Sequence, residues 1–431
     1  MEKLLQNLIV KSENGVVVIL NPRNMHWIRM KSDKLQKFLN SPNQKRELLR
    51  LFDTKYDLFQ QKQLEEKSNI RSAYISVTNR CNMRCGFCTM LSSPEESTES
   101  DLTFDQIVSV VIPKLRNIGV KKVVISGGEP LIRKDIVDIL KAFSDNFGRD
   151  RIVLQTNGLL LDDEKLKKIK KYIGTMEISI ENIFCNDKHL QKIKNVLQLS
   201  KLYNIDLGLS FVVDSNTKIH IFKGIDLCHE YGTAFTMRIV SLVGRAIDNN
   251  WNDKTYQTKE TLDLYRRIID YIITKKYFDD ILVDSFLGKL EPKRHCGAFG
   301  KVLAIHADGM CYMCGNFKNE RYCIGSIVNS NYEEILSNLD NKMNDKEYLS
   351  EFCVDCNTIC NGCDVQYFCS GPCMAEIAEN KDNFLKITEK CLGIKILKKY
   401  ALYYYETEKD IEENLRMFSQ YLKDELRKIN G

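Results

Sequence analysis

The chain has 431 residues, which is long enough for about three domains of ordinary size. Its 43% apolar and 28% charged residues exclude an intrinsically disordered chain, and a net charge of +5 from 63 basic and 58 acidic residues argues against a nucleic-acid partner. Because no run approaches about 18 apolar residues and no cleavable signal is recognisable, we expect no membrane span, no membrane partner and a cytoplasmic location.

The first part of the chain, residues 1–70, is predicted to form a small α+β domain. Apolar residues flank the turn-type segment NPRN at 21–24, and helical patterns follow. The expected elements are strands at 16–20 and 26–30 and helices at 32–39 and 46–59. The charged stretch QQKQLEEKS at 60–68 has the composition of a linker.

Strand and helix patterns then alternate over residues 71–250, which indicates six β/α units and a parallel sheet, open or closed into a barrel. The strands are expected at 74–78, 122–126, 151–155, 176–180, 207–213 and 235–240. The helices are expected at 102–116, 132–146, 162–172, 187–203 and 217–231. Ligands of such sheets bind at the carboxyl ends of the strands, and the motifs of this region fall there.

Three of the 16 cysteines, Cys81, Cys85 and Cys88, follow the first of these strands with the spacing Cys-x3-Cys-x2-Cys. Three thiolates on one loop can hold three irons of a [4Fe–4S] cluster and leave the fourth iron open. A structural zinc site would need a fourth ligand, and none lies close in sequence. The spacing, with Phe87 before the last cysteine, resembles the signature of the radical S-adenosylmethionine (SAM) superfamily. The resemblance implies a partial (β/α)6 barrel in which these cysteines hold the catalytic cluster.

A glycine-rich segment follows the second predicted strand and resembles the GGEP motif of the superfamily, which binds SAM. Its residues are Ser126, Gly127, Gly128, Glu129 and Pro130. Glycines let the backbone approach a ligand closely. Glu129 or nearby carbonyls can accept hydrogen bonds from the SAM ammonium group.

Other candidate SAM-binding residues lie at later strand ends. Asn157 either contacts the ligand or ends its strand in a turn. In relatives a serine and an acidic residue at the positions of Ser179 and Glu181 meet the SAM carboxylate and ribose, although an Asp-Gly pair is commoner there. Arg238 either pairs with the SAM carboxylate or is solvated. The string Gly-Arg-Ala at 244–246 resembles one common in this branch, without a role we can derive.

The resemblance implies SAM and a [4Fe–4S] cluster as cofactors, and an external electron donor such as flavodoxin or ferredoxin. In this superfamily the reduced cluster gives one electron to bound SAM, which yields methionine and a 5′-deoxyadenosyl radical. That radical takes a hydrogen atom from a substrate that the protein positions.

Eleven further cysteines lie in the last third of the chain. Clustered cysteines in a chain without a secretion signal favour metal or iron–sulfur sites over disulfides. We expect a helical linker, a cysteine-rich domain and a C-terminal helix at 251–293, 294–395 and 396–431. A hairpin turning at 308–309 should bring Cys314 back beside Cys296. Cys185 and Cys228, beside helices, are predicted to be buried structural thiols.

Seven of these cysteines reproduce the spacing of the SPASM domain, an auxiliary-cluster module of radical SAM enzymes that modify peptides and proteins. They are Cys296, Cys314, Cys360, Cys363, Cys369, Cys373 and Cys391. The resemblance implies that one auxiliary [4Fe–4S] cluster is held by Cys360, Cys363, Cys369 and Cys391. It implies that three irons of another are held by Cys296, Cys314 and Cys373, which makes three clusters in all.

The fourth ligand of the latter cluster is undetermined, because some relatives use a cysteine where this chain has Val302. The iron either stays open to a substrate thiolate or is bound by Cys311, Cys323, Cys353 or Cys356. The pair Cys353-x2-Cys356 is alternatively a separate metal site or two unpaired thiols. Zinc is the alternative to iron for the whole domain, since Cys-x2-Cys pairs also build zinc ribbons.

Two features separate the main classes of SPASM enzyme, the sulfatase maturases and the maturases of ribosomally made peptides. Sulfatase maturases carry an aspartate after the cysteine matching Cys314, where this chain has Gly315. They also lack an extension like residues 1–70. That extension resembles the small winged-helix element with which peptide maturases hold a leader peptide as an added strand, although a plain packing domain would have the same pattern.

The expected function is therefore maturation of a ribosomally synthesised precursor peptide, whose leader binds the N-terminal domain. A Cys thioether is the expected crosslink. A carbon–carbon crosslink, an epimerisation and formylglycine formation by a sulfatase-maturase-like enzyme are alternatives. A recognition protein with degenerate catalysis and a nucleic-acid-modifying enzyme are the competing classes.

Overall fold

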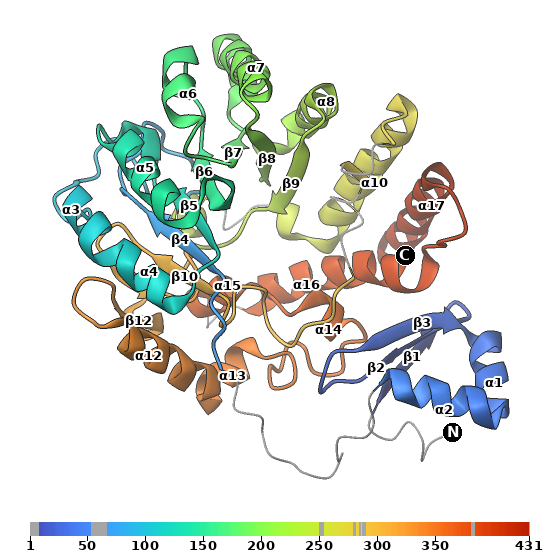
Figure 1. Cartoon of the computed structure of the whole chain (residues 1–431). Coiled ribbons are helices and arrows are strands. Elements are labelled where there is room, and N and C mark those ends of the chain that lie inside the picture. The colour runs from blue at the N-terminus through green and yellow to red at the C-terminus, as the bar shows by residue number, and fades with distance from the viewer. Residues whose placement is uncertain are drawn as a thin grey trace.

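The protein, shown in Figure 1 as a computed structural model, contains two β-sheets. The structure describes residues 8–52, 67–249, 254–278, 282–283, 286, 290–380 and 384–430. A three-stranded antiparallel sheet belongs to the N-terminal part, and a nine-stranded sheet forms the centre. The predicted linker at 60–68 and the end of the predicted helix at 46–59 fall largely outside the described residues.

Six adjacent parallel strands form the main part of the large sheet, in the order in which they occur along the chain. They are β4 (Ser72–Ser76), β5 (Lys122–Ser126), β6 (Ile152–Thr156), β7 (Thr175–Ser179), β8 (Asp206–Val213) and β9 (Ala234–Ile239). The predicted strands agree with them to within two residues at each end. The predicted fold class, an α/β chain with a parallel core, is confirmed.

Helices return along the outer face of these strands (Figure 1). They are α3 (Phe104–Gln106), α4 (Ile112–Ile118), α5 (Ile136–Phe147), α6 (Asp163–Ile169), α7 (Asp187–Leu202), α8 (Ile221–Tyr231), α9 (Arg245–Asn249) and α10 (Thr258–Lys275). A π-helical segment, Ile107–Val111, joins α3 to α4 where one helix was predicted. Short 3-10 turns occur at Pro130–Ile132, Arg149–Arg151, Ile183–Cys185, Lys218–His220, Lys254–Tyr256 and Glu320–Tyr322.

Alternation along the strands decides which side chains meet the helices. Ile75, Ile125 and Ile178 belong to the core between sheet and helices and are 0% exposed. Burial of each such side chain contributes about 1.5–3 kcal/mol. The other face carries polar residues, for example Gln155, whose Nε2 donates to Glu177 Oε2 at 2.6 Å. This inner face is the one available to a ligand.

The cysteine-rich region extends the same sheet, which the sequence did not predict. Its strands are β10 (Val302–Ile305), β11 (Met310–Tyr312) and β12 (Cys323–Ser326). β10 pairs in parallel with β4, and β11 and β12 follow in antiparallel. The predicted hairpin is present, and Gly309 at its turn has a φ of +83°. The cysteine-rich region is thus continuous with the barrel sheet at its β4 edge.

The N-terminal sheet has the order β1 (Ile9–Glu13), β2 (Val16–Leu20), β3 (Trp27–Lys31), and is followed by α1 (Ser32–Asn40) and α2 (Pro42–Leu51). β1 was not predicted, because its central residues are polar or exposed and carry no apolar alternation. The remaining helices are α12 (Tyr332–Asn344), α13 (Lys346–Phe352), α14 (Gln366–Cys369), α15 (Met374–Glu379), α16 (Phe384–Lys399) and α17 (Ile411–Asn430). The predicted single C-terminal helix is interrupted after the π-helical segment Tyr400–Tyr404.

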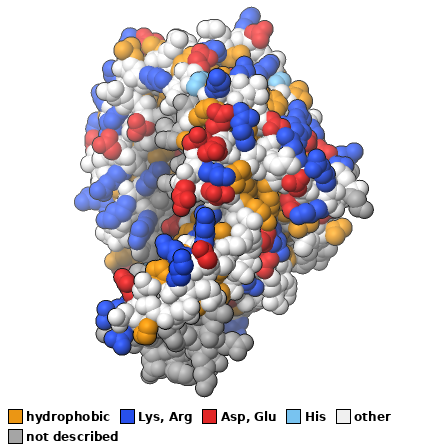
Figure 2. All heavy atoms as spheres, turned by 90° about the vertical axis from the view of Figure 1, so that its right-hand side faces the viewer, with side chains coloured by type: hydrophobic (Ala, Val, Ile, Leu, Met, Phe, Trp, Pro, Cys, Tyr) orange, Lys and Arg blue, Asp and Glu red, His pale blue; other side chains and the backbone are white. Residues whose placement is uncertain are grey.

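The surface carries mixed charges. Figure 2 shows Lys and Arg interspersed with Asp and Glu on the face that carries α10 and α17. None of the helices in the described residues is both long and apolar enough to cross a bilayer.

Lys114, on α4, links the barrel to the cysteine-rich hairpin. Its Nζ donates to the carbonyl oxygens of Ile327 at 2.6 Å and of Ser330 at 2.6 Å. Lys114→Met would leave these carbonyls without their donor, so we expect it to lower the free energy of unfolding by about 1–3 kcal/mol. Lys121→Met, at an exposed position, is the control. Urea unfolding of both variants measures the difference, and equal midpoints would contradict this role.

Candidate functional site

The candidate site begins at the carboxyl end of β4, where a loop carries Cys81, Cys85 and Cys88. The three thiols lie on one loop and interact electrostatically: the pKa of Cys85 is raised to about 12 by burial and then by the charges of Glu181, Cys88 and Cys81. The pKa of Cys81 is raised by burial and, among others, by the charge of Cys88. Binding a metal here must therefore release protons from the thiols.

A glycine and an arginine hold this loop from the other edge of the parallel sheet, after the carboxyl end of β9 and at the start of α9. Arg245 Nη1 donates to the Cys85 carbonyl at 2.7 Å, its Nη2 to the Ser92 carbonyl at 2.9 Å, and its backbone N–H to the Cys88 carbonyl at 3.0 Å. Gly244 has a φ of +60°, and a Cβ there would lie 2.5 Å from the Thr89 carbonyl oxygen. These contacts give the Gly-Arg-Ala string a role that its sequence alone did not reveal.

The GGEP segment packs its backbone against the same loop. The Gly128 N–H donates to the Thr78 carbonyl at 2.8 Å, and the Glu129 N–H donates to the Arg80 carbonyl at 3.0 Å. A Cβ on Gly127 would lie 2.4 Å from the Thr78 oxygen, and one on Gly128 would lie 2.3 Å from the Arg80 oxygen. The glycines are therefore needed for the approach of two backbones, one of which leads into Cys81.

The Glu129 side chain makes its contacts within the protein. It is 0% exposed, and its carboxylate accepts from Thr156 Oγ1 at 2.7 Å, from the Asn157 N–H at 2.8 Å and from the Leu131 N–H at 3.1 Å. The carboxylate thus joins the ends of β5 and β6, and of the two predicted acceptors for the SAM ammonium group the neighbouring carbonyls are the less occupied. Pro130 begins the turn that buries the carboxylate.

Two asparagines, which follow β6 and β7, contact the cysteine loop; only the first of them, Asn157, was predicted as a site residue. Asn157 Nδ2 donates to Asn82 Oδ1, inside the loop, at 2.8 Å. Asn182 Nδ2 donates to Cys85 Sγ at 3.4 Å, a contact the sequence did not suggest. Ser179 is half-buried on the inner face, in register with Ser210.

Glu181, next to Asn182, is buried with an unsatisfied atom. The residue is 4% exposed, and its Oε2 has no hydrogen-bond partner. Burial raises the pKa of its carboxyl group to about 7. A buried acceptor without a donor is costly, so its position beside Cys85 marks a place where a ligand hydroxyl would be accommodated.

Arg238, on β9, lies in register with Val212, and its side chain is exposed. Its charge reaches Tyr74 on β4, whose pKa is raised by burial and by Glu177 and lowered by Arg238. The same charge also acts on Cys314. Tyr74, Glu177 and Arg238 thus surround one inner space next to Cys314. The sequence analysis missed Tyr74 and Glu177, although the alternation of β4 and β7 carries the signal.

Electrostatic interactions link the C-terminal cysteines in two neighbourhoods. The pKa of Cys314 is raised to about 12 by burial, with contributions from the charges of Cys373 and Cys296. The pKa of Cys391 is raised to about 12 by burial, with contributions from the charges of Cys369, Cys360 and Cys363. The assignment of these cysteines to two cluster sites stays a prediction.

The remaining cysteines form other neighbourhoods. Burial raises the pKa of Cys311, and the charge of Cys323 contributes to that shift. Burial likewise raises the pKa of Cys353, with contributions from the charges of Asp355 and Cys356. Cys228 is buried as predicted, but Cys185 is exposed at the surface, with Sγ 3.5 Å from His220 Nε2, so its predicted burial is wrong. It ends a short 3-10 turn outside the core.

Within the described ranges, no three His, Cys, Asp or Glu side chains are grouped closely enough for a single metal ion.

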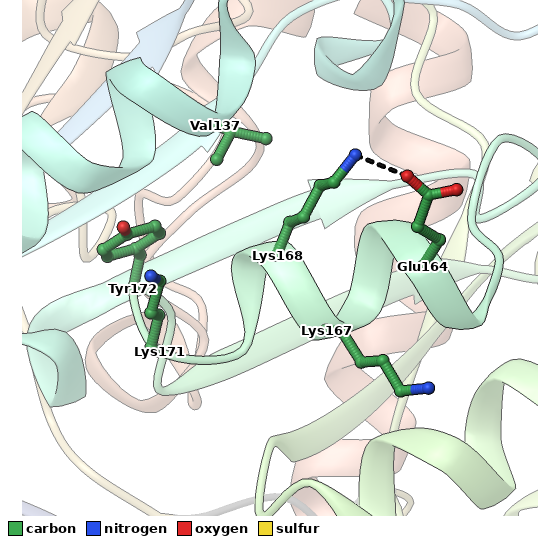
Figure 3. A pocket seen from close by; sticks show the side chains of 6 residues that line it. All are labelled: Val137, Glu164, Lys167, Lys168, Lys171 and Tyr172. Atoms are coloured by element: carbon green, nitrogen blue, oxygen red, sulfur yellow. Dashed lines mark hydrogen bonds and ion pairs between the residues drawn. The ribbon is translucent and has the colours of Figure 1, made fainter.

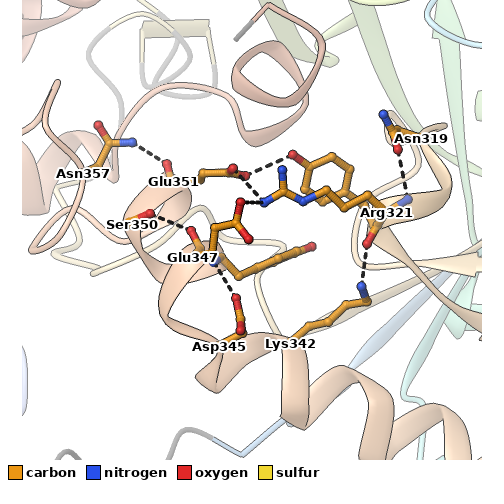
Figure 4. Close-up of polar contacts among 10 residues, drawn as sticks. Asn319, Arg321, Lys342, Asp345, Glu347, Ser350, Glu351 and Asn357 are labelled. Carbon is orange, nitrogen blue, oxygen red and sulfur yellow. Dashed lines mark hydrogen bonds and ion pairs between the residues drawn. The ribbon is translucent and has the colours of Figure 1, made fainter.

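Ion pairs fix α13 beside this region. Figure 4 shows Arg321 between two carboxylates, with Nη2 2.7 Å from Glu347 and 3.0 Å from Glu351. Tyr322 OH also donates to Glu351 at 3.0 Å.

Figure 3 shows a hollow on the outer helices, between α5 and α6, away from the candidate site. Its Lys168 pairs with Glu164 at 2.6 Å. It contains none of the predicted site residues.

The domain that carries the first cysteines matches a known family. Residues 75–201 match the Radical SAM superfamily, in agreement with the cysteine spacing. GTP 3′,8-cyclase of Clostridium perfringens (strain 13 / Type A) is 33% identical over 150 residues, which are 34% of this chain and 44% of that protein. The chain thus spans less than half the length of this curated relative.

Two solved structures share the fold over most of the chain. Streptococcus suis SuiB bound to S-adenosylmethionine is 16% identical, with a TM-score of 0.51, over 87% of this chain and 96% of SuiB. SuiB has also been solved bound to the precursor peptide SuiA. Native anSMEcpe with bound AdoMet and Cp18Cys peptide is 16% identical, with a TM-score of 0.55, over 84% of this chain and 99% of that chain. At these identities the likeness establishes the fold alone.

Arg245 offers a test of how the cysteine loop is held. Arg245→Lys keeps the charge but loses the fork that donates to the loop carbonyls of Cys85, Leu91 and Ser92, so the loop amides at 82–92 should exchange with deuterium about tenfold faster. Arg84→Lys is the matched control within the loop, because the Arg84 side chain is 65% exposed. Hydrogen exchange followed by mass spectrometry measures both. Unchanged exchange in Arg245→Lys would contradict the assignment.

Proposed function

We propose that this protein is a radical SAM/SPASM maturase that installs a crosslink in a ribosomally synthesised precursor peptide. The proposal is supported by the spacing of ten cysteines along the sequence, which divides them into sets of three, three and four thiols. One set lies at the carboxyl end of β4, in the radical SAM domain. The other two lie in the region that extends the same sheet.

The first set fits a [4Fe–4S] cluster with one open iron, and the space beside it fits SAM. Cys81, Cys85 and Cys88 supply three thiolates, and the unsatisfied Glu181 Oε2 is an acceptor suited to a ribose hydroxyl. When bound, cluster and SAM together supply a 5′-deoxyadenosyl radical that takes a hydrogen atom from the substrate. Backbone carbonyls of the GGEP segment are the proposed acceptors for the SAM ammonium group.

The chain's own residues have separate tasks in this proposal. Gly128, Gly244 and Arg245 keep the cysteine loop in one conformation, in which Cys81, Cys85 and Cys88 would hold the cluster. Ser179 and Arg238 contact the SAM carboxylate. Tyr74 lines the inner space next to Cys314, where a substrate residue would approach the auxiliary region.

The crosslink is proposed to be a Cys thioether. A carbon of the peptide would lose a hydrogen atom to the radical, and a peptide thiol would lose its proton. Formation of the C–S bond would release one electron, which an auxiliary cluster would accept, so the peptide would lose two hydrogen atoms in all. Cys296, Cys314 and Cys373 leave a fourth coordination position, which suits activation of that peptide thiol as a thiolate. Cys360, Cys363, Cys369 and Cys391 complete the ligands of the second auxiliary cluster.

The substrate class is supported by the fold and by one sequence feature. SuiB and anSMEcpe, whose folds resemble this chain, have been solved with peptides. Gly315 stands where sulfatase maturases have an aspartate, which favours a peptide crosslink over formylglycine. The N-terminal sheet has two edge strands, β1 and β3, at which a leader peptide would add as a further strand.

Metal content tests the proposal most directly. After anaerobic reconstitution we expect about 12 iron atoms per chain, four for each cluster, and reductive cleavage of SAM to 5′-deoxyadenosine. Peptides encoded beside the gene should lose two hydrogens on treatment, measured by mass spectrometry. About 4 iron atoms with bound zinc would refute the auxiliary clusters, and turnover of GTP with no change in any peptide would refute the substrate class.

Glu181 predicts a pH dependence of SAM binding. Burial raises the pKa of its carboxyl group to about 7, and the ionised form is the better acceptor for a ribose hydroxyl. SAM affinity should therefore be highest above the pKa and fall about tenfold for each pH unit below it. Glu181→Gln should bind SAM more weakly and without this slope. Anaerobic calorimetry measures both, and a flat profile for the wild type would contradict the role.

A further inference from the structure

The N-terminal sheet is packed against the part of the chain that carries the four-thiol set. One face of the sheet contributes Leu20, 1% exposed, to an apolar cluster that contains the buried Cys360. The same face contributes Val18, 3% exposed, to a second cluster against which Cys363 and Cys369 pack. Figure 1 shows β2 and β3 lying beside α14, the helix that ends at Cys369. The sheet therefore encloses this set of thiols.

An aromatic side chain belongs to both apolar clusters. Trp27, the first residue of β3, packs against the Val18 cluster and against the Leu20 cluster. Its ring meets Phe368 edge to face, with the centroids 4.9 Å apart and the planes at 74°. Phe368 directly precedes Cys369 on α14. Trp27 thus connects the N-terminal domain to the backbone that presents a predicted cluster ligand.

Polar contacts surround this apolar face and fix its position. Lys399 Nζ, on α16, lies 2.6 Å from Glu13 Oε2 at the end of β1. Arg294 Nη2 donates to the Pro22 carbonyl at 2.7 Å. Lys11, on β1, lies 3.7 Å from Asp364, the residue after Cys363. An apolar centre with a polar rim is the anatomy of a stable interface, so the N-terminal domain is docked at a defined place.

The other face of the same sheet is occupied by its own helices. Val17 and Ile19 alternate with Val18 and Leu20, and they pack with Leu35 of α1. Both faces of this small sheet are therefore buried, one by its own domain and one by the four-thiol region. Leader binding by strand addition would use an edge and would leave the enclosing face in place.

We propose that the N-terminal sheet is a wall of the second auxiliary-cluster site, so that docking of this domain and occupancy of the site by a cluster stabilise each other. The inference rests on the proposed assignment of Cys360, Cys363, Cys369 and Cys391 to an iron–sulfur cluster. A ligand that binds one state of a protein stabilises that state, and the coupling is reciprocal. The domain that is proposed to bind the leader peptide is thereby also part of the shell of an electron-transfer site.

Trp27 provides a direct readout of this proximity. The chain has two tryptophans, so Trp251→Phe leaves Trp27 as the sole emitter in the full-length protein. Iron–sulfur clusters absorb in the near ultraviolet, where tryptophan emits, so loading should lower the Trp27 emission several-fold. Adding Cys360→Ser and Cys369→Ser should leave about 8 of about 12 iron atoms and restore the emission. The proposal would be overturned if Trp27 emission were not quenched in the chain that carries its clusters. It would also be overturned if the emission were quenched equally in the variant with Cys360→Ser and Cys369→Ser.

A matched pair of variants tests the wall itself. Leu20→Ala opens the enclosing face, whereas Val10→Ala shortens a side chain that is 39% exposed on β1. A chelator should remove about 4 iron atoms several-fold faster from Leu20→Ala than from the wild type. The removal rate of the other 8 or so iron atoms should equal that of the wild type, and Val10→Ala should show wild-type rates throughout. Equal rates in Leu20→Ala and the wild type would overturn the proposal. The iron content of the wild type reports on the proposed function separately from these rate differences.

Discussion

The site depends on the close approach of three backbone segments at the carboxyl end of the barrel. The loop after β4 is contacted by Gly127 and Gly128 from one side and by Gly244 from the other. A Cβ at each of these positions would lie only 2.3–2.5 Å from a backbone oxygen of the loop. Arg245 adds hydrogen bonds to the carbonyls of the same loop. Because these contacts are made by main chain, they constrain the loop in a way that side-chain packing alone would not.

Burial of the thiols follows from the same constraint. A loop held between glycine backbones has little access to water, and the pKa of Cys85 rises to about 12 as a result. The thiols of the C-terminal sets show the same effect, with pKa values of about 12 for Cys314 and Cys391. Burial thus disfavours the charged form of the Cys85, Cys314 and Cys391 thiols, which protects them from reactions that need a free thiolate.

Much of the fold could be predicted from the sequence, because its signals are local. The strand at 122–126 was predicted with the observed bounds, since its buried Val and Ile residues are flanked by turn residues. The missed features have nonlocal causes: β1 is polar and is held by pairing with β2, and the pairing of β10 with β4 joins distant parts of the chain. The same holds for the site. Cys81, Cys85 and Cys88 are recognisable by spacing, whereas the contact of Arg245 with Cys85 joins residues 160 positions apart.

The pairing of β10 with β4 also has a consequence for biosynthesis. Val302 pairs with Ser72, so the partner of the β4 edge is made 230 residues after it. At about 5–20 residues per second, that edge waits roughly 10–50 s on the ribosome before its neighbour exists. During that interval an unpaired strand stands next to the loop of Cys81, Cys85 and Cys88, open to other chains. Slow translation in this stretch would lengthen the exposure, so chaperones that cover strand edges would matter most while the middle of the chain is being made.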